Sequence, residues 1–325
     1  MTMADLTKAK PAVKKKRLTW SKDDTELSIL ALPTTIWYAL FCYLPMFGIV
    51  LAFKKYKIVD ATRSFVYNVI HSQWAGFNNF LYFLRLNDFP MILRNTILYN
   101  VVFIILDIVI PVSLAIMINN IYSKKMSKTY QTLMFMPHFM SWVVIAYFIY
   151  AFLVTDKGLL NGIIRACGGT NIDWYNEPKY WPFILTFMHI WKTMGYSMVV
   201  YLASITGIDT SLYEAAVLDG ASKFQQARYI TLPSLRPMII MMFILAVGRI
   251  FSSDFGLFYQ ATRGAGVPLN TVATTFDVKI FQMVTTSADQ GRNAAASMFQ
   301  SIIGCITILT ANAIVRKVDK ASALI

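Results

Sequence analysis

Charged side chains and cysteines are scarce in this sequence. Only 14% of the 325 residues are charged, whereas 56% are hydrophobic, and the mean hydropathy is +0.51. Because soluble domains usually carry about 25% charged residues, this composition excludes an ordinary soluble domain and predicts a membrane protein. The three cysteines contain no CxxC pair, which excludes a disulfide framework and a cysteine-ligated metal, so we expect packing roles for Cys42, Cys167 and Cys305.

Motifs for hydrolytic or nucleotide chemistry are also missing. The sequence contains no GxSxG, HExxH or Walker A segment. Its three histidines, His71, His138 and His189, lack metal-ligand spacing. The DFG triplet at 254–256 stands without the other kinase motifs and is a chance match. We therefore predict no catalytic residue, metal or cofactor on this chain, and if ATP drives its function another polypeptide must hydrolyse it.

The positive charge does not indicate a nucleic-acid partner. The formal net charge is +13, but the basic residues flank apolar segments and no basic module with interleaved aromatic residues is present. This distribution is typical of the excess of lysine and arginine on the cytoplasmic side of membrane proteins.

Long apolar runs predict an all-α, polytopic membrane protein. About 20 apolar residues cross the hydrocarbon core of roughly 30 Å, and six stretches meet this requirement. We predict membrane spans at 28–53, 92–120, 132–153, 181–206, 237–258 and 294–316. They form one six-span membrane domain, 28–316, between a basic tail, 1–27, and a short C-terminal tail, 317–325.

The distribution of basic residues predicts which side of the membrane each loop faces. With the N-terminus inside, sixteen lysines and arginines lie in cytosolic segments and eleven in longer outer loops. Lys54, Lys55 and Lys57 oppose this orientation, but the N-terminal tail and the short loop around Lys124 outweigh them. We therefore predict that both termini are cytosolic.

One polar interval, 209–237, reads as two short helices joined by a glycine. Ser211 with Glu214 and Ser222 with Gln225 have the spacing of capping boxes, and Gly220 stands where a helix end favours a left-handed residue. This predicts a first helix over 212–219. The face shared by the two helices carries side chains so small that another protein could approach the backbone: Ala215, Ala216, Gly220 and Ala221.

This interval carries the pattern E-A-A-x3-G-x9-I-x-L-P at all seven positions, and it resembles the signature loop of permease subunits of bacterial binding-protein-dependent ABC importers. The resemblance implies the type I importer permease fold and a cytosolic coupling helix that docks into an ATPase subunit. The coupling residues that it implies are Glu214, Ala215, Ala216, Asp219, Gly220, Ala221, Ile230, Leu232 and Pro233.

Other segments are similar to the oligosaccharide and polysaccharide branch of that family, related to the alginate and maltose permeases. They include 43–48 with 52–54, the W-x-G-F-x-N-F element at 74–80, 137–143, and 190–195. The resemblance implies import of oligosaccharides across a bacterial cell membrane. The implied partners are a second permease subunit forming a heterodimer, a dimer of ATPases that binds ATP and Mg²⁺, and an extracytoplasmic solute-binding protein.

Aromatic and charged residues within the predicted spans are candidates for the substrate pathway. Aromatic planes pack on sugar rings, and a few polar groups bind the hydroxyls. The candidates are Trp142, Tyr147, Trp191, Lys192, Tyr196, Tyr201, Arg249, Asp254 and Tyr259. Two interpretations of the charges stay open: Asp107 pairs with Lys192 or Arg249 as a structural network, or one of these cations faces the cavity and favours an acidic sugar.

The outer loop at 259–293 has a helical stripe at Val272, Phe276, Ile280 and Met283. It predicts a short amphipathic helix that either closes over the cavity or only rests at the interface.

Two other functional classes remain possible at this level. An ion-coupled secondary transporter of small polar solutes would usually show internal repeats, and none is clear between the halves. An intramembrane enzyme would need several convergent polar groups at one depth, where only Asp107 qualifies.

Overall fold

The computed structural model describes residues 21–58, 60, 62–286 and 289–318. Residues 1–20 of the predicted basic tail and the C-terminal residues from 319 onward lie outside the described residues, whereas residues 22–27 of that tail are helical. The chain divides into two compact units, one ending at Gly48 and the other beginning at Ile49.

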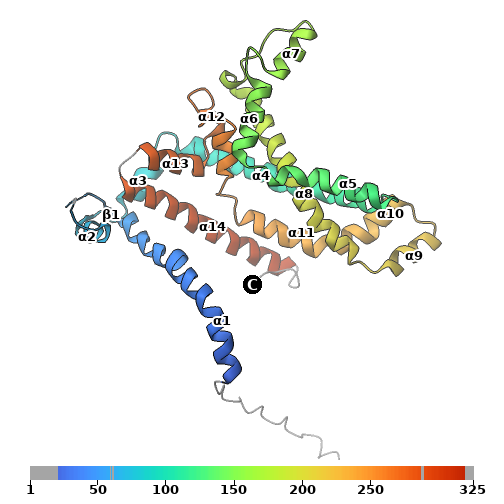
Figure 1. Cartoon of the computed structure of the whole chain (residues 1–325), viewed down its shortest axis with the longest axis horizontal. Coiled ribbons are helices and arrows are strands. Elements are labelled where there is room, and N and C mark those ends of the chain that lie inside the picture. Colours follow the sequence, from blue (N-terminus) through green and yellow to red (C-terminus); the bar gives the residue numbers. More distant parts are fainter. Residues whose placement is uncertain (1–20, 59, 61, 287–288, 319–325) are drawn as a thin grey trace, which may run out of the picture. The chain divides into compact units, whose positions relative to one another are not determined.

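Helices make up most of the described chain (Figure 1). The α-helices are α1 (Lys22–Tyr38), α2 (Phe65–His71), α3 (Asn78–Leu84), α4 (Phe89–Asn119), α5 (Lys124–Phe135), α6 (Trp142–Leu153), α7 (Leu159–Ala166), α8 (Trp181–Thr206), α9 (Thr210–Leu218), α10 (Lys223–Gln226), α11 (Leu232–Val247), α12 (Asn270–Ala273), α13 (Phe276–Thr286) and α14 (Gln290–Val318). Short 3₁₀ or π segments are η1 (Ala39–Tyr43), η2 (Leu44–Phe53), η3 (Met136–Phe139), η4 (Trp174–Asn176), η5 (Pro178–Tyr180), η6 (Ala227–Thr231) and η7 (Gly256–Gln260). Two short strands, β1 (Lys54–Lys55) and β2 (Gln73–Trp74), pair in antiparallel fashion.

Most of the predicted spans are helices in the structure. Within the described residues, four helical stretches are long and apolar enough to cross a membrane, and one bent pair would make a fifth. The four are Lys22–Phe53, Phe89–Asn119, Lys223–Val247 and Gln290–Lys317. The predicted span 181–206 has the bounds of helix α8.

The predicted span at 132–153 is not one straight helix. Helix α5 ends at Phe135, η3 follows, and α6 begins at Trp142, with an angle of 98° between Lys124–Phe139 and Trp142–Leu153. Pro137 lies in the first turn of η3, and the Ser141 hydroxyl accepts a hydrogen bond from the Val144 N–H to start α6.

Helix α8 packs directly on the backbone at this break. A Cβ added to Gly195 would lie 2.0 Å from the carbonyl oxygen of Met134 and 2.7 Å from the Cα of Phe135. Only a glycine therefore permits this approach, and it sets the distance between α8 and the end of α5.

We expect Gly195→Ala to destabilise the protein by about 1–3 kcal/mol, because the added methyl group meets backbone that cannot rotate away. Thermal denaturation of the purified subunit would measure the loss. Gly162→Ala in α7 is the matched control, since a Cβ there has no neighbour within 4 Å. An unchanged midpoint for Gly195→Ala would show that α8 does not pack this closely.

The predicted span at 237–258 is also wrong in its limits. The helical stretch begins at Lys223, passes through η6 and Pro237, and ends at Val247. The second short helix of the 209–237 interval is thus the first turn of this long stretch. Beyond Val247 the chain turns away before η7 starts at Gly256.

The W-x-G-F-x-N-F element is structural. The Asn79 amide donates hydrogen bonds to the carbonyl oxygens of Ala52 (2.9 Å) and Lys54 (3.0 Å), and the Trp74 ring stacks on Phe53. The ammonium of Lys54 donates to the Ile70 carbonyl oxygen at 2.6 Å. Lys54, one of the three lysines that oppose the predicted orientation, thus stabilises the loop that follows the first predicted span.

Helices α4 and α8 form the centre of the second unit, and buried side chains gather in three clusters around them. One cluster joins α4 and α8 to α6, η7 and α12, the second joins them to α11, and the third joins α3, α4, α13 and α14. The predicted outer helix is present as α13, where Phe276 and Met283 are buried, although Val272 lies on the separate α12.

Candidate functional site

Helix α9 begins earlier than predicted and with a different cap. The carboxylate of Asp209 accepts a hydrogen bond from the Ser211 N–H at 3.0 Å, so the helix starts at Thr210 and the predicted Ser211–Glu214 capping box is absent. The hydrogen bond from the Ser211 backbone, and to a smaller extent that from the Ser211 side chain, holds the pKa of Asp209 below its usual value. This contribution to helix stability is present above the ordinary aspartate pKa and is lost as the pH falls through the lowered value.

The turn at Gly220 has the predicted geometry. Its φ is +77°, its N–H donates to the Val217 carbonyl oxygen, and the Ala221 N–H donates to Ala216, which together make a Schellman motif. The second predicted capping box, between Ser222 and Gln225, is present.

Most of the segment around this turn is exposed. Glu214, Ala215, Asp219 and Gly220 are exposed, and no residue of α9 is buried. The Glu214 carboxylate has no hydrogen bond or ion pair with the described residues. Ala216 and Ala221 are half-buried.

Two large apolar side chains flank the small residues of the turn and were missed by the sequence analysis. Leu218 is 89% exposed and Phe224 is 74% exposed. An exposed apolar patch of this kind is typical of an interaction surface. Their position on either side of Gly220, in an interval that forms no apolar run long enough to span a membrane, was the available signal.

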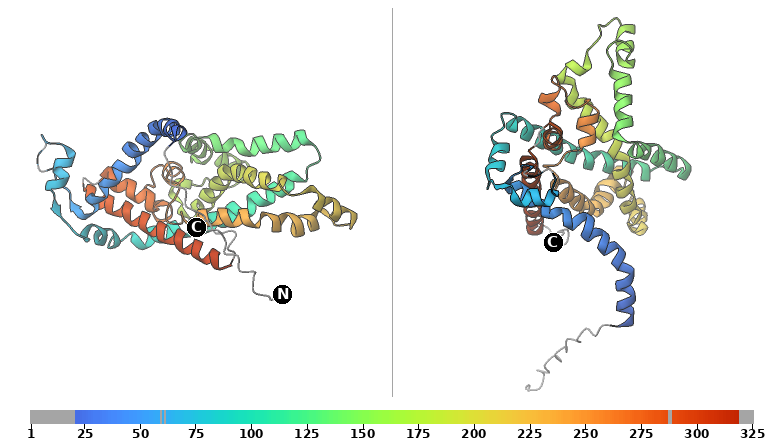
Figure 2. Two further views of the ribbon diagram at one scale, coloured as in Figure 1. Left: turned by 90° about the horizontal axis from the view of Figure 1, so that it is seen from below. Right: turned by 60° about the vertical axis from the view of Figure 1, so that its left-hand side comes forward.

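A contact between side chains joins α9 to the long helical stretch Lys223–Val247. The hydroxyl of Tyr213 lies 2.9 Å from that of the buried Thr231, which belongs to η6. Ile230 is half-buried, while Leu232 and Pro233 are exposed on the same continuous helical stretch that reaches Val247. Figures 1 and 2 show α9 and α10 at the end of the second unit where α4 ends and α5 begins.

A separate group of polar residues lies where α6 meets η7. The indole Nε1 of Trp142 donates to the Asp254 carboxylate at 2.6 Å, and a Cβ on Gly256 would lie 2.2 Å from the Trp142 ring. The ammonium of Lys192 lies 5.3 Å from the centroid of that ring. The structure therefore brings three of the candidate pathway residues together: Trp142, Lys192 and Asp254.

Lys192 forms hydrogen bonds with the backbone at the break between α5 and α6. Its ammonium donates to the carbonyl oxygen of His138 at 3.0 Å and to that of Met140. These are backbone groups freed by the break between α5 and α6, and groups of this kind must find partners inside a membrane protein.

One of the two interpretations paired Asp107 with Lys192 or Arg249, and this pairing is wrong. The Asp107 carboxylate lies 2.9 Å from the Nε2 of His189 and accepts a hydrogen bond of 2.9 Å from the Thr193 hydroxyl, so it joins α4 to α8. Arg249 is exposed at the end of the α11 stretch.

The remaining candidates are dispersed. Tyr201 is fully buried in the cluster with α11, Tyr147 is 73% exposed, and Tyr196 stacks on His138. Tyr259 stacks on Phe255, with ring centroids 4.9 Å apart.

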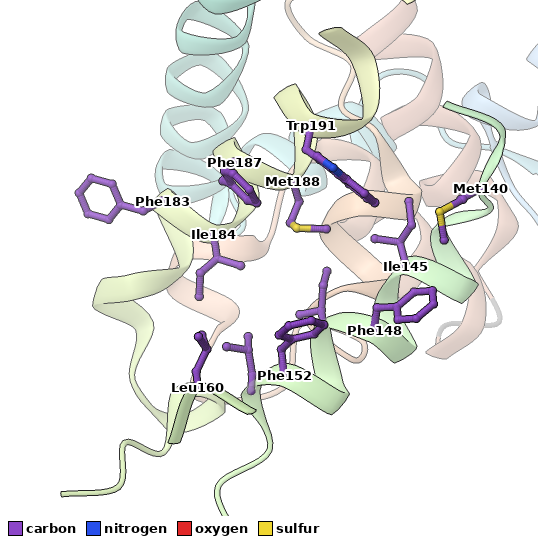
Figure 3. A pocket seen from close by; sticks show the side chains of 12 residues that line it. Met140, Ile145, Phe148, Phe152, Leu160, Phe183, Ile184, Phe187, Met188 and Trp191 are labelled. Atoms are coloured by element: carbon purple, nitrogen blue, oxygen red, sulfur yellow. The ribbon is translucent and has the colours of Figure 1, made fainter. Parts of the chain in front are cut away.

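Trp191 lines a large apolar pocket between α6 and α8 (Figure 3). Its volume is about 740 Å³, and side chains of α6, α7 and α8 such as Phe152, Leu160 and Phe187 surround it. All its lining side chains are apolar apart from the indole nitrogen. A ligand rich in hydroxyls would leave its hydrogen bonds unmade there, so this pocket is unsuited to a sugar despite its size.

Metal chemistry finds no support in the described part of the chain, where no cluster of three or more histidine, cysteine, aspartate or glutamate residues could hold a metal ion.

Comparisons with known proteins agree over most of the chain. Residues 108–321 match the family described as "Binding-protein-dependent transport system inner membrane component". The chain is 30% identical to the protein LplB of Bacillus subtilis over 299 residues, covering 92% of this chain and 91% of that protein. It is also 30% identical to the polygalacturonan/rhamnogalacturonan transport system permease protein YteP of Bacillus subtilis, covering 90% of this chain and 88% of YteP.

Two solved structures are similar in fold. One is a bacterial ABC transporter involved in the import of the acidic polysaccharide alginate, with a TM-score of 0.81 and 28% identity, covering 92% of this chain and 97% of the matched chain. The other is a bacterial alginate ABC transporter in complex with a periplasmic protein that holds an alginate pentasaccharide, with a TM-score of 0.81 and 29% identity, covering 92% and 96%.

Proposed function

The chain belongs to the family of binding-protein-dependent transport system inner membrane components, and from this premise we propose that it forms half of the translocation pathway of an ATP-driven oligosaccharide importer. The observation that carries the proposal is the exposed helix α9, which carries part of the E-A-A pattern and is joined by the Tyr213–Thr231 contact to the long helical stretch Lys223–Val247 of the same unit.

Coupling follows from these contacts. A partner ATPase dimer, which would bind ATP and Mg²⁺, would contact the segment from Glu214 to Ala221, including the exposed Leu218, and the exposed Phe224 beyond it. Because the Gly220 turn is closed by two backbone hydrogen bonds and Tyr213 contacts Thr231, α9 and the start of the long helix move together. Movement of the ATPase would then tilt the stretch Lys223–Val247, which is continuous through η6.

The other proposed partners follow from relatives. One solved neighbour is in complex with a periplasmic solute-bound protein, and we expect an extracytoplasmic solute-binding protein here too. A second permease subunit would complete the pathway as a heterodimer. We expect the chain to lie in the bacterial cell membrane with both termini in the cytosol, an orientation that would put α9 on the side where ATP is available.

The proposal of an oligosaccharide substrate rests on the named relatives and on the candidate site. YteP is a polygalacturonan/rhamnogalacturonan permease, and the solved neighbours import alginate. In this chain, Trp142 and Tyr259 offer aromatic planes, and the exposed Asp254 offers a hydrogen-bond acceptor. The ion-coupled secondary transporter has no support from these relatives.

The dependence of uptake on its energy source tests this function. Cells that carry the complete importer should lose uptake of oligosaccharides when ATP is depleted and retain it when an ionophore collapses the ion gradients. The opposite pattern would contradict the proposal and favour the secondary transporter.

A further inference from the structure

A small pocket lies between η7, α13 and α14, and it joins aromatic and polar side chains. Its volume is about 330 Å³. Phe255 precedes η7, Asp277 and Phe281 belong to α13, and Ser297 and Gln300 belong to α14. Two aliphatic residues of α13 complete the lining.

Its aromatic side is a group of three rings. The centroids of Phe255 and Phe281 are 4.7 Å apart, and the Tyr259 ring lies 4.9 Å from the first and 4.8 Å from the second. Phe281 and Phe255 each present carbon surface to the pocket, on which the C–H face of a sugar ring can pack.

Its polar side is held in place by a network that leaves acceptors available. The Asp277 carboxylate accepts from the N–H and the hydroxyl of Ser253, and the Gln300 amide donates to Asp277 and to the Phe251 carbonyl oxygen. The side-chain oxygens of Gln300 and Ser297 have no hydrogen-bond partner among the described residues. These two oxygens and the Asp277 carboxylate can therefore receive sugar hydroxyls in a fixed geometry.

The charge of the pocket selects the kind of sugar. Asp277 lines it and no cation does, among the described residues. Lys279, on the same helix, is paired with Asp88 at 3.0 Å, and Lys192 is engaged with backbone carbonyls. A carboxylate placed beside Asp277 would meet a like charge without compensation.

We propose that this pocket binds one uncharged pyranose ring of the transported oligosaccharide, with Phe255 and Phe281 against the ring face and Asp277, Ser297 and Gln300 accepting its hydroxyls. The proposal rests on the proposed importer function and adds a specificity. The sugar unit bound here carries no carboxylate, whatever the charge of the rest of the oligosaccharide.

Filling the pocket tests the binding claim. Cells with the complete importer are given a plant cell-wall hydrolysate containing both neutral and uronate-bearing oligosaccharides, and mass spectrometry follows which species they deplete. Ser297→Trp should lower that uptake at least tenfold at equal amounts of importer in the membrane. Ile306→Trp is the matched control, because it is exposed on the opposite face of α14 and should transport normally.

Each outcome separates the claims. Wild-type uptake by Ser297→Trp would overturn the pocket and leave the importer function standing. Uptake of oligosaccharides built only from uronate units, as efficient as that of species with a neutral unit, would overturn the specificity. A wild-type importer that depletes no oligosaccharide would contradict the proposed function itself, and the pocket with it.

Discussion

Gly220→Trp should insert in the membrane at the wild-type level while losing substrate-stimulated ATPase activity in the reconstituted complex. A Cβ at Gly220 has no neighbour within 4 Å, so an indole has room in the free subunit, and the strain of a left-handed residue is about 1–2 kcal/mol. In the complex the same indole would stand where the ATPase is proposed to contact the backbone. We expect stimulation to fall at least tenfold.

Gly168→Trp is the matched control for the cap itself. Gly168 ends helix α7 with φ +81°, close to the +77° of Gly220, and a Cβ there is equally unobstructed. It lies in a predicted outer loop, so it carries the same strain without touching the ATPase. Normal stimulation of the ATPase by the Gly220→Trp complex would sink the docking proposal.

The coupling segment could be predicted largely because its interactions are local. The Gly220 turn and the Ser222–Gln225 box are closed by hydrogen bonds between residues no more than five positions apart. The first box failed because Asp209 and Ser211 are both good N-caps, and the pattern alone does not choose between them. Features closed by local hydrogen bonds could therefore be predicted, whereas the start of α9 was predicted wrongly because two nearby residues compete for the N-cap position.

The break in the third predicted span could not be predicted, because its partners come from distant segments. Residues 132–153 read as one apolar run, and Pro137 alone does not distinguish a kink from an end. Lys192, 54 positions after His138, supplies the missing donor. The same limit applies to Asp107, for which the sequence offered Lys192 and Arg249 as partners, whereas its carboxylate contacts His189, 82 positions away.

The saccharide pocket was missed for a related reason. Asp277 and Phe281 stand in a predicted outer loop, and Ser297 and Gln300 stand in a predicted membrane span. Only the packing of α13 on α14 and the turn after Val247 bring Phe255 to the same place. The helical stripe predicted α13 but not which residues its polar face would meet.

Lys192→Met should lower the thermal midpoint of the purified complex without changing its preference between neutral and uronate oligosaccharides. The variant removes the donor to the carbonyl oxygens of His138 and Met140 at the break between α5 and α6. The bond to His138 is exposed and the bond to Met140 is partly buried, so we expect their loss to cost about 1 kcal/mol, at the low end of the range for a carbonyl that loses its donor. Because the ammonium is already engaged by the protein, its loss should be seen in stability rather than in the choice of sugar.

Lys192→Arg separates the two roles that a cation could have at this position. The guanidinium keeps the charge and can donate to both carbonyls, so we expect its midpoint to lie between those of the wild type and Lys192→Met. A Met variant that is as stable as the wild type but rejects uronate substrates would contradict this account. In that case the ammonium would face the sugar, and the negative pocket at Asp277 would have a compensating cation within the pathway.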